Sequence, residues 1–193
     1  SPANVILQQI KMRPHGDIYI PADKYYTDEA IKADVVQEPR IFAYLIPVIM
    51  VQKDNPYKIR KLSDLTKKDL KVGIVDERIG AIGRLFVNLI KKNHIKMDNI
   101  NIVFHAPMVG ELGNAIKLKS IDTAVVWKSL AMMYPKEADY ITIPREKNII
   151  ITVSAGIIKT SKNKEIARKF LEFMTSQKGK AILEKHHYTT KKP

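Results

Sequence analysis

The sequence has no cysteine, so disulfides and thiol chemistry are excluded, and this absence is compatible with either a reducing or an oxidising compartment. Hydrophobic runs of membrane-spanning length are also missing, because no window approaches the ~18 apolar residues that a membrane-spanning helix needs. The chain further lacks the basic segment followed by an apolar one that marks a signal peptide. It opens abruptly on Ser1, so we expect that the start of the protein is missing and that the absent leader says nothing about export.

Acidic side chains are in short supply. The 193 residues carry 20 acidic and 33 basic side chains, for a formal net charge of +13. Such an excess is typical of proteins that bind nucleic acid. However, the lysines are scattered among acids, as in Lys67-Lys68-Asp69, and the aromatic residues are not interleaved with them. We therefore expect a solvated, lysine-rich surface and no nucleic-acid partner, with an excess charge that can speed the approach of a small anion.

Sets of residues suited to catalysis or metal binding are scarce as well. Asp76 and Glu77 are adjacent in a loop, where side chains rarely converge, and no nucleophile or second base accompanies them. His186 and His187 lie in a lysine-rich tail, where solvation is more common than metal binding. The sequence thus predicts neither an enzyme nor a metal site, and it indicates no cofactor.

The stretch from Lys71 to Lys92 is the one around which the rest of the chain is organised. Residues 72–75 form a short apolar run typical of a strand, and residues 76–80 are polar and end in glycine. Apolar residues then recur at helical spacing: Ile82, Leu85, Phe86, Leu89 and Ile90. The pattern predicts a strand, a loop and a helix.

The start of this helix lacks the usual cap. Gly80 and Ala81 offer no side-chain oxygen to the first free amides, which Ser, Thr, Asp or Asn would normally supply. Uncapped N–H groups past the carboxyl end of a strand form a ready site for an anion. The alternative is that Gly80 is a tolerated cap in an ordinary strand-to-helix turn, and this stretch alone favours neither interpretation.

A second strand and helix follow the same plan. Residues 100–104 are expected to form a strand, and Pro107 suits the first position of the next helix because its missing N–H would be unsatisfied there anyway. No Ser, Thr, Asp or Asn stands immediately before that helix. His105, beside this second loop, is a further candidate for contact with the anion.

Two long apolar runs, 41–52 and 149–158, indicate how the chain is divided. Each is longer than an ordinary strand of ~5 to 6 residues. We interpret them as the outward and return crossings between two lobes. One of the two lobes is then discontinuous in sequence.

The remaining elements are short. We expect helices over residues 5–10 and 25–33, the second with Thr27 or Asp28 near its start, and strands over 17–20, 123–127 and 140–144. A helix capped by Ser161 or Asn163 is expected to bury a stripe of Ile166, Phe170, Phe173 and Met174. A last helix starts at Ser176.

Four segments carry a resemblance to a known family: DERIGAIGR, APMVGELGNAIK, DTAVVW and SKNKEIARKFLEFMTSQKGKAILEKHHY. In order and spacing they resemble blocks of the periplasmic molybdate-binding proteins of ABC importers, and the likeness spans essentially the whole chain. It implies an α/β fold of two lobes, the type II periplasmic-binding-protein fold, with a ligand cleft between the lobes. Lobe 1 would comprise residues 1–46 and 155–193, without its N-terminal strand, and lobe 2 would comprise residues 47–154.

The resemblance also implies where a ligand binds. The family holds a tetrahedral oxyanion with hydroxyls and backbone amides and requires no cationic side chain, and the matching amides fall at Ile82 and Val109. Trp127 stands where the family has a tyrosine, and its indole N–H donates but accepts nothing, which suits a fully ionised oxyanion. Packing in the core is the alternative for Trp127. Ser1 and Asn4 are the candidate donors of the first lobe.

The expected function is the capture of molybdate or tungstate for the membrane permease of an ABC importer. We expect a monomer that works in the periplasm or outside the cell. One form of this expectation is a protein anchored to the membrane by a leader that is absent from this chain. Two alternatives are open. The ligand is sulfate or another oxyanion, or the chain is the cytoplasmic effector-sensing domain of a LysR-type regulator, which shares the fold.

Overall fold

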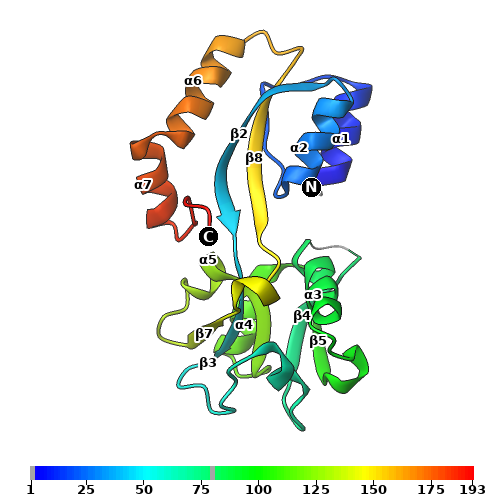
Figure 1. Ribbon diagram of the computed structural model, residues 1–193, viewed down its shortest axis with the longest axis vertical. Coiled ribbons are helices and arrows are strands. Elements are labelled where there is room, and N and C mark those ends of the chain that lie inside the picture. The colour runs from blue at the N-terminus through cyan, green and yellow to red at the C-terminus, as the bar shows by residue number, and fades with distance from the viewer. Residues whose placement is uncertain (1–2, 79–80) are drawn as a thin grey trace. The chain divides into compact units, whose positions relative to one another are not determined.

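The computed structural model describes residues 3–78 and 81–193. Within these residues no helix is long and apolar enough to cross a membrane. The chain forms two compact units, which are coloured by residue number in Figure 1. Unit 1 comprises Ser1–Leu45 and Ile151–Pro193, and unit 2 comprises Ile46–Ile150.

Unit 1 is built on an antiparallel sheet of three strands. In spatial order these are β1 (Ile18–Tyr19), β8 (Ile151–Ile158) and β2 (Val36–Leu45). Helices α1 (Ala3–Met12) and α2 (Lys24–Lys32) lie on one side of the sheet in Figure 1, and α6 (Lys164–Thr175) and α7 (Gln177–Lys185) lie on the other. Because successive strand residues point to opposite faces, the neighbours Ile157 and Ile158 belong to different apolar clusters, one under each pair of helices.

Unit 2 is built on a sheet of five strands in the spatial order β5-β4-β6-β3-β7. The strands are β3 (Pro47–Gln52), β4 (Val72–Val75), β5 (Ile102–Ala106), β6 (Thr123–Trp127) and β7 (Ala138–Thr142). The helices are α3 (Ala81–Lys92), α4 (Val109–Lys117) and α5 (Lys128–Ala131), with the 3-10 turns η1 (Leu62–Thr66), η2 (Met97–Asn99) and η3 (Arg145–Lys147). β4 runs parallel to β5 and β6, whereas β3 runs antiparallel to β6 and β7.

The helices α3 and α4 cover the parallel part of this sheet. All five residues that the sequence placed on the apolar face of α3 are buried. The chain leaves β4 for its neighbour β5 on one side and then returns past β4 to β6. Since such crossovers are right-handed, the two helices lie on opposite faces of the sheet, which explains why every residue of β4 is buried.

The apolar run 41–52, which we interpreted as one crossing between lobes, is divided between two strands. β2 ends at Leu45 in unit 1, and Pro47 opens β3 in the sheet of unit 2. Proline has no N–H to donate to a ladder and is accepted as the first residue of a strand, so Pro47 marks the break. The chain passes between the units after Leu45 and after Ile150, whereas we expected lobe boundaries after residues 46 and 154.

Two helix starts in unit 1 depend on side-chain caps. Asp23 caps α2 by accepting a hydrogen bond from the Tyr25 N–H at 2.9 Å, and Thr27 and Asp28 lie just after, near the start of the helix at Lys24. Thr27 is fully buried and shares a hydrogen bond with the Ser154 hydroxyl at 2.9 Å. The last helix starts at Ser176–Gln177, as the sequence predicted, and Ser176 caps it by accepting from the Gly179 N–H at 3.2 Å.

The apolar face of α6 was assigned correctly only in part: Met174 packs against the core of unit 1, but the other three predicted residues are exposed. Ile166 and Phe170 are 70% and 46% exposed, whereas Ala167 and Leu171 are 3% and 2% exposed and pack in a core cluster with the sheet. Consecutive residues are about 100° apart around a helix axis. Apolar residues occupy a wider arc of α6 than the sheet covers, and the half of the arc that contains Ile166 and Phe170 remains at the surface.

The burial of α6 predicts how two neighbouring positions differ in stability. Leu171→Ala is expected to lower the free energy of unfolding of unit 1 by about 2–4 kcal/mol, because it leaves a cavity against the sheet. Phe170→Ala removes a larger but half-exposed side chain, and we expect a loss of only about 1 kcal/mol. Urea unfolding of both variants measures the difference, and a larger loss for Phe170→Ala would show that the buried face is the other one.

Candidate functional site

Three parallel strands of unit 2 end at the same edge of its sheet. β4 lies between β5 and β6, so the carboxyl ends of the three strands are neighbours. Val75 pairs with Ala106, and the next residue, Asp76, donates its N–H to the Ala106 carbonyl at 2.9 Å. The chain crosses from β4 to β5 on one side and then to β6 on the other, so the ends of β4 and β6 form the switch point where open α/β sheets bind ligands, and the end of β5 is next to it.

The start of α4 at this edge has no side-chain cap. Met108 is the N-cap residue, in an extended conformation with φ −137° and ψ 149°, and its side chain makes no capping hydrogen bond. Pro107 thus lies two residues before the first helical residue, Val109, and not at the first helical position as the sequence suggested. The Glu111 N–H donates to the Met108 carbonyl at 3.1 Å, whereas nothing in the described part of the chain accepts from the Val109 N–H. That N–H lies at the positive end of the helix dipole.

The start of α3 is packed directly on the end of β4. Ile82, whose N–H belongs to the first turn, is only 4% exposed, and Gly80 lies outside the described residues. Gly83 permits the close approach, because a Cβ at this position would lie 2.4 Å from the Val75 carbonyl oxygen and 2.9 Å from that of Asp76. The first turn of α3 is therefore in contact with the backbone of Asp76.

Trp127 is the third predicted residue at this edge. It is the last residue of β6 and the N-cap residue of α5, and its backbone pairs with Pro47 of β3. The four residues of β6 before it are buried, but Trp127 is only partly buried. The sheet topology therefore brings Ile82, Val109 and Trp127 to one end of three adjacent strands.

An ion pair that the sequence did not reveal lies between β4 and α3. Arg78 donates its backbone N–H and its Nε–H to Asp76 Oδ1, at 2.9 Å and 3.0 Å, and its Nη2 to Oδ2 at 2.5 Å. The Asp76 side chain is 13% exposed and that of Arg78 is 83% exposed. These side-chain hydrogen bonds, followed by the backbone one, lower the pKa of Asp76 to about 2. Asp76 is therefore ionised at neutral pH and paired. The spacing Asp-x-Arg in a loop was the available signal, since Asp often accepts from the N–H two residues on.

A pocket of about 420 Å³ opens beside this ion pair. Asp76, Arg78 and His105 line it together with apolar side chains of α3 and β5, including Val87 and Ile102. His105 is exposed, and its protonated form would also favour the ionised form of Asp76, with a smaller effect on the pKa of Asp76 than Arg78 has. Glu77 also lines the pocket, so its polar part combines two acidic side chains, Asp76 and Glu77, with two basic ones, Arg78 and His105.

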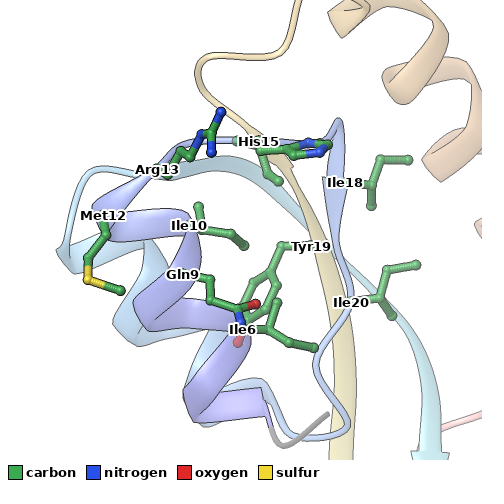
Figure 2. A pocket seen from close by; sticks show the side chains of 11 residues that line it. Ile6, Gln9, Ile10, Met12, Arg13, His15, Ile18, Tyr19 and Ile20 are labelled. Atoms are coloured by element: carbon green, nitrogen blue, oxygen red, sulfur yellow. The ribbon is translucent and has the colours of Figure 1, made fainter.

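A pocket of about 990 Å³ in unit 1 has a different character. Figure 2 shows isoleucine side chains of α1 and of the segment around β1 along it, with Arg13 and His15 grouped at one end. Ile6, Ile10 and Ile18 are among the residues that line it. Such an apolar lining does not replace the water around a fully ionised anion. We therefore do not place the anion site there.

The other sequence candidates lie elsewhere. Ser1 lies outside the described residues. Asn4 is an exposed residue in the first turn of α1, in unit 1. His186 is the C-cap residue of α7, and His187 follows it. Among the residues that the structure describes, no group of three or more His, Cys, Asp or Glu side chains could hold a metal ion.

Comparison with known sequences identifies relatives of the whole chain. The family model of bacterial extracellular solute-binding proteins matches residues 1–189. The molybdate-binding protein ModA of Mycobacterium tuberculosis (strain H37Rv) is 23% identical over 179 residues, which cover 91% of this chain and 66% of that protein. The chain therefore spans just under two thirds of the length of this relative.

Solved structures share the fold. The substrate-binding domain assigned to a molybdenum ABC transporter from Clostridium difficile superposes with a TM-score of 0.83 at 20% identity, covering 100% of this chain and 84% of that one. The sulfate-binding protein SubI of Mycobacterium tuberculosis gives a TM-score of 0.76 at 14% identity, covering 100% of this chain and 75% of that one. The type II periplasmic-binding-protein fold expected from the sequence is thereby confirmed.

The family and these relatives are solute-binding proteins and not enzymes. The family model matches the chain from its first residue to Thr189, across both units. The chain therefore belongs to the family of bacterial extracellular solute-binding proteins.

Proposed function

We propose that this protein captures a tetrahedral oxyanion, molybdate or tungstate, and delivers it to the membrane permease of an ABC importer. The observation that carries the proposal is the edge of the unit 2 sheet where the starts of α3 and α4 lie beside Trp127. Membership of a solute-binding family supports a small ligand, and a relative is named for molybdate. A location in the periplasm or at the cell surface, and a monomeric state, are parts of the same proposal.

The chemistry of the edge suits a dianion that carries no proton. The N–H groups of Ile82 and Val109 and the indole N–H of Trp127 can only donate hydrogen bonds. Helix-end amides bring partial positive charge that is already oriented, so no cationic side chain has to be desolvated for the ligand. Asn4 is the proposed donor from unit 1 that the structure describes, through its side-chain N–H group, and Ser1 is the other proposed donor.

Calorimetric titration of the natural full-length protein with molybdate, tungstate, sulfate and phosphate tests the proposal. Molybdate and tungstate are expected to bind with one site per chain and more tightly than sulfate, and phosphate is expected to bind least because it carries a proton at neutral pH. Sulfate is the second candidate ligand, since a sulfate-binding protein shares the fold. Tighter binding of sulfate than of molybdate would select that candidate, and failure of all four anions would end the oxyanion proposal.

Trp127 provides both a donor and a probe, since it is the only tryptophan of the chain. Trp127→Phe keeps an aromatic ring and deletes the N–H, and we expect about a tenfold loss of molybdate affinity, as for one hydrogen bond to a charged group. The fluorescence of the wild-type protein is expected to change on titration with molybdate. Unchanged affinity in Trp127→Phe would assign Trp127 to packing alone.

A further inference from the structure

The proposed anion site has an acceptor beside it that ought to weaken it. Asp76 follows β4 directly, its backbone contacts the position of Gly83 in the first turn of α3, and its N–H is bonded to Ala106 of β5. Its backbone therefore lies at the edge where the proposed donors begin, and its carboxylate lines the pocket beside α3 and β5. A carboxylate there repels a dianion, and its free lone pairs accept a hydrogen bond from an anion that carries a proton.

Arg78 donates hydrogen bonds to this carboxylate. The guanidinium and the backbone N–H of Arg78 together make three hydrogen bonds, which reach both oxygens of Asp76. The Arg78 side chain is otherwise largely in solvent, at 83% exposed, so its principal contact is with Asp76. A fork-shaped guanidinium fills the acceptor sites of one carboxylate in a way that a single lysine ammonium does not.

We propose that Arg78 is a specificity-determining residue, which keeps the site selective for fully ionised oxyanions by neutralising and occupying the Asp76 carboxylate. This inference rests on the proposed function and adds to it a residue that need not touch the ligand. The low pKa of Asp76 agrees with this proposal, because the carboxylate stays charged near neutral pH and protonation does not neutralise it. The ion pair with Arg78 instead prevents the carboxylate from repelling the anion.

The proposal predicts a change in selectivity, which a purely structural role for Arg78 would not produce. In Arg78→Ala the freed carboxylate repels molybdate but accepts the proton of hydrogen phosphate. We expect molybdate affinity to fall by at least about tenfold. The ratio of molybdate to phosphate affinity is expected to fall by more, because the hydrogen bond from hydrogen phosphate to the carboxylate offsets the repulsion. Added salt is expected to reduce the difference in molybdate affinity between the wild type and Arg78→Ala, since part of this difference comes from charge repulsion.

The experiment is calorimetry with molybdate and phosphate on four variants and the wild type. Asp76→Asn keeps an oxygen for the Arg78 N–H and is expected to bind molybdate at least as well as the wild type. The double variant Asp76→Asn/Arg78→Ala is expected to recover wild-type selectivity. Arg84→Ala is the matched control, because Arg84 is an exposed arginine on the first turn of α3 that makes no ion pair with Asp76 in the described structure.

Each outcome decides a different point. Loss of selectivity in Arg78→Ala that the double variant restores, with Arg84→Ala like the wild type, supports the proposal. Unchanged molybdate affinity in Arg78→Ala, or a loss that Asp76→Asn does not repair, overturns it while the proposed function stands. A wild-type protein that binds none of the oxyanions overturns the proposed function and this inference with it. Thermal melting of each variant identifies a loss that comes from unfolding.

Discussion

Replacing Val109 with proline is expected to weaken molybdate binding by roughly 10- to 150-fold, which corresponds to the loss of one hydrogen bond to a charged group, about 1.5–3 kcal/mol. The substitution deletes the N–H at the first position of α4 and leaves the rest of the helix intact. Proline is well tolerated at this position. The preceding residue, Met108, already has the extended conformation that proline demands of its neighbour. We therefore expect the melting temperature to change little.

A matched substitution separates the loss of the amide from the effect of proline on a helix. Gln177 is the first residue of α7, and its N-cap residue Ser176 is also extended, with φ −68° and ψ 167°. Gln177→Pro in unit 1 is expected to leave both melting temperature and molybdate affinity close to wild type. Calorimetry on both variants measures the contrast. Equal affinity for molybdate in Val109→Pro and the wild type would remove Val109 from the site.

The parts of the fold that follow from local pattern were predictable. The apolar repeat of α3 has one buried side, and the five residues that it selects are all buried. The strand 123–127 has the predicted bounds, because it is a short buried run with a charged residue on each side. The lack of a capping residue before Val109 was also visible, since a cap is decided by the residue type at one position.

Pairing between distant segments was not predictable in the same way. The run 41–52 is apolar throughout, and an apolar run does not reveal to which sheet each part belongs. Its first part pairs with β8 in unit 1 and its last part with β6 and β7 in unit 2. The face of α6 shows the same limit, because Phe170 and Leu171 are both apolar and only the position of the sheet decides which is buried.

In the candidate site, too, some features follow from local sequence and others depend on the path of the chain. Residue types indicated the uncapped helix starts, and the resemblance to molybdate-binding proteins implied donors at positions 82, 109 and 127. Sheet order brings these positions to one end of the adjacent strands β4, β5 and β6. The ion pair between Asp76 and Arg78 depends on the path of the loop between β4 and α3, and the sequence offered only an Asp-x-Arg spacing. A side-chain pair that modifies a site is harder to foresee than the backbone that forms it.

Gly83 allows α3 to pack directly on the end of β4, and Gly83→Ala is expected to be the most damaging small substitution in unit 2. The added Cβ would lie 2.4 Å from the Val75 carbonyl oxygen and 2.9 Å from both the carbonyl carbon and oxygen of Asp76. These are backbone atoms of β4 and of the residue that follows it, so α3 has to move away from β4. We expect a loss of about 1–3 kcal/mol or more in the free energy of unfolding, as for an overpacked core, together with weaker molybdate binding.

The matched control is Gly110→Ala, because a Cβ at Gly110 would meet no atom within 4 Å. Alanine is also the better helix former, so this variant is expected to be as stable as the wild type or more stable by about 0.5–1 kcal/mol. Thermal melting and urea unfolding of both variants compare a closed position on α3 with an open one on α4. If the two substitutions had similar effects, the close contact between Gly83 and the end of β4 would not be what positions α3. If only Gly83→Ala is destabilised and it also binds molybdate more weakly, the contact between α3 and β4 positions the amide of Ile82 for the ligand.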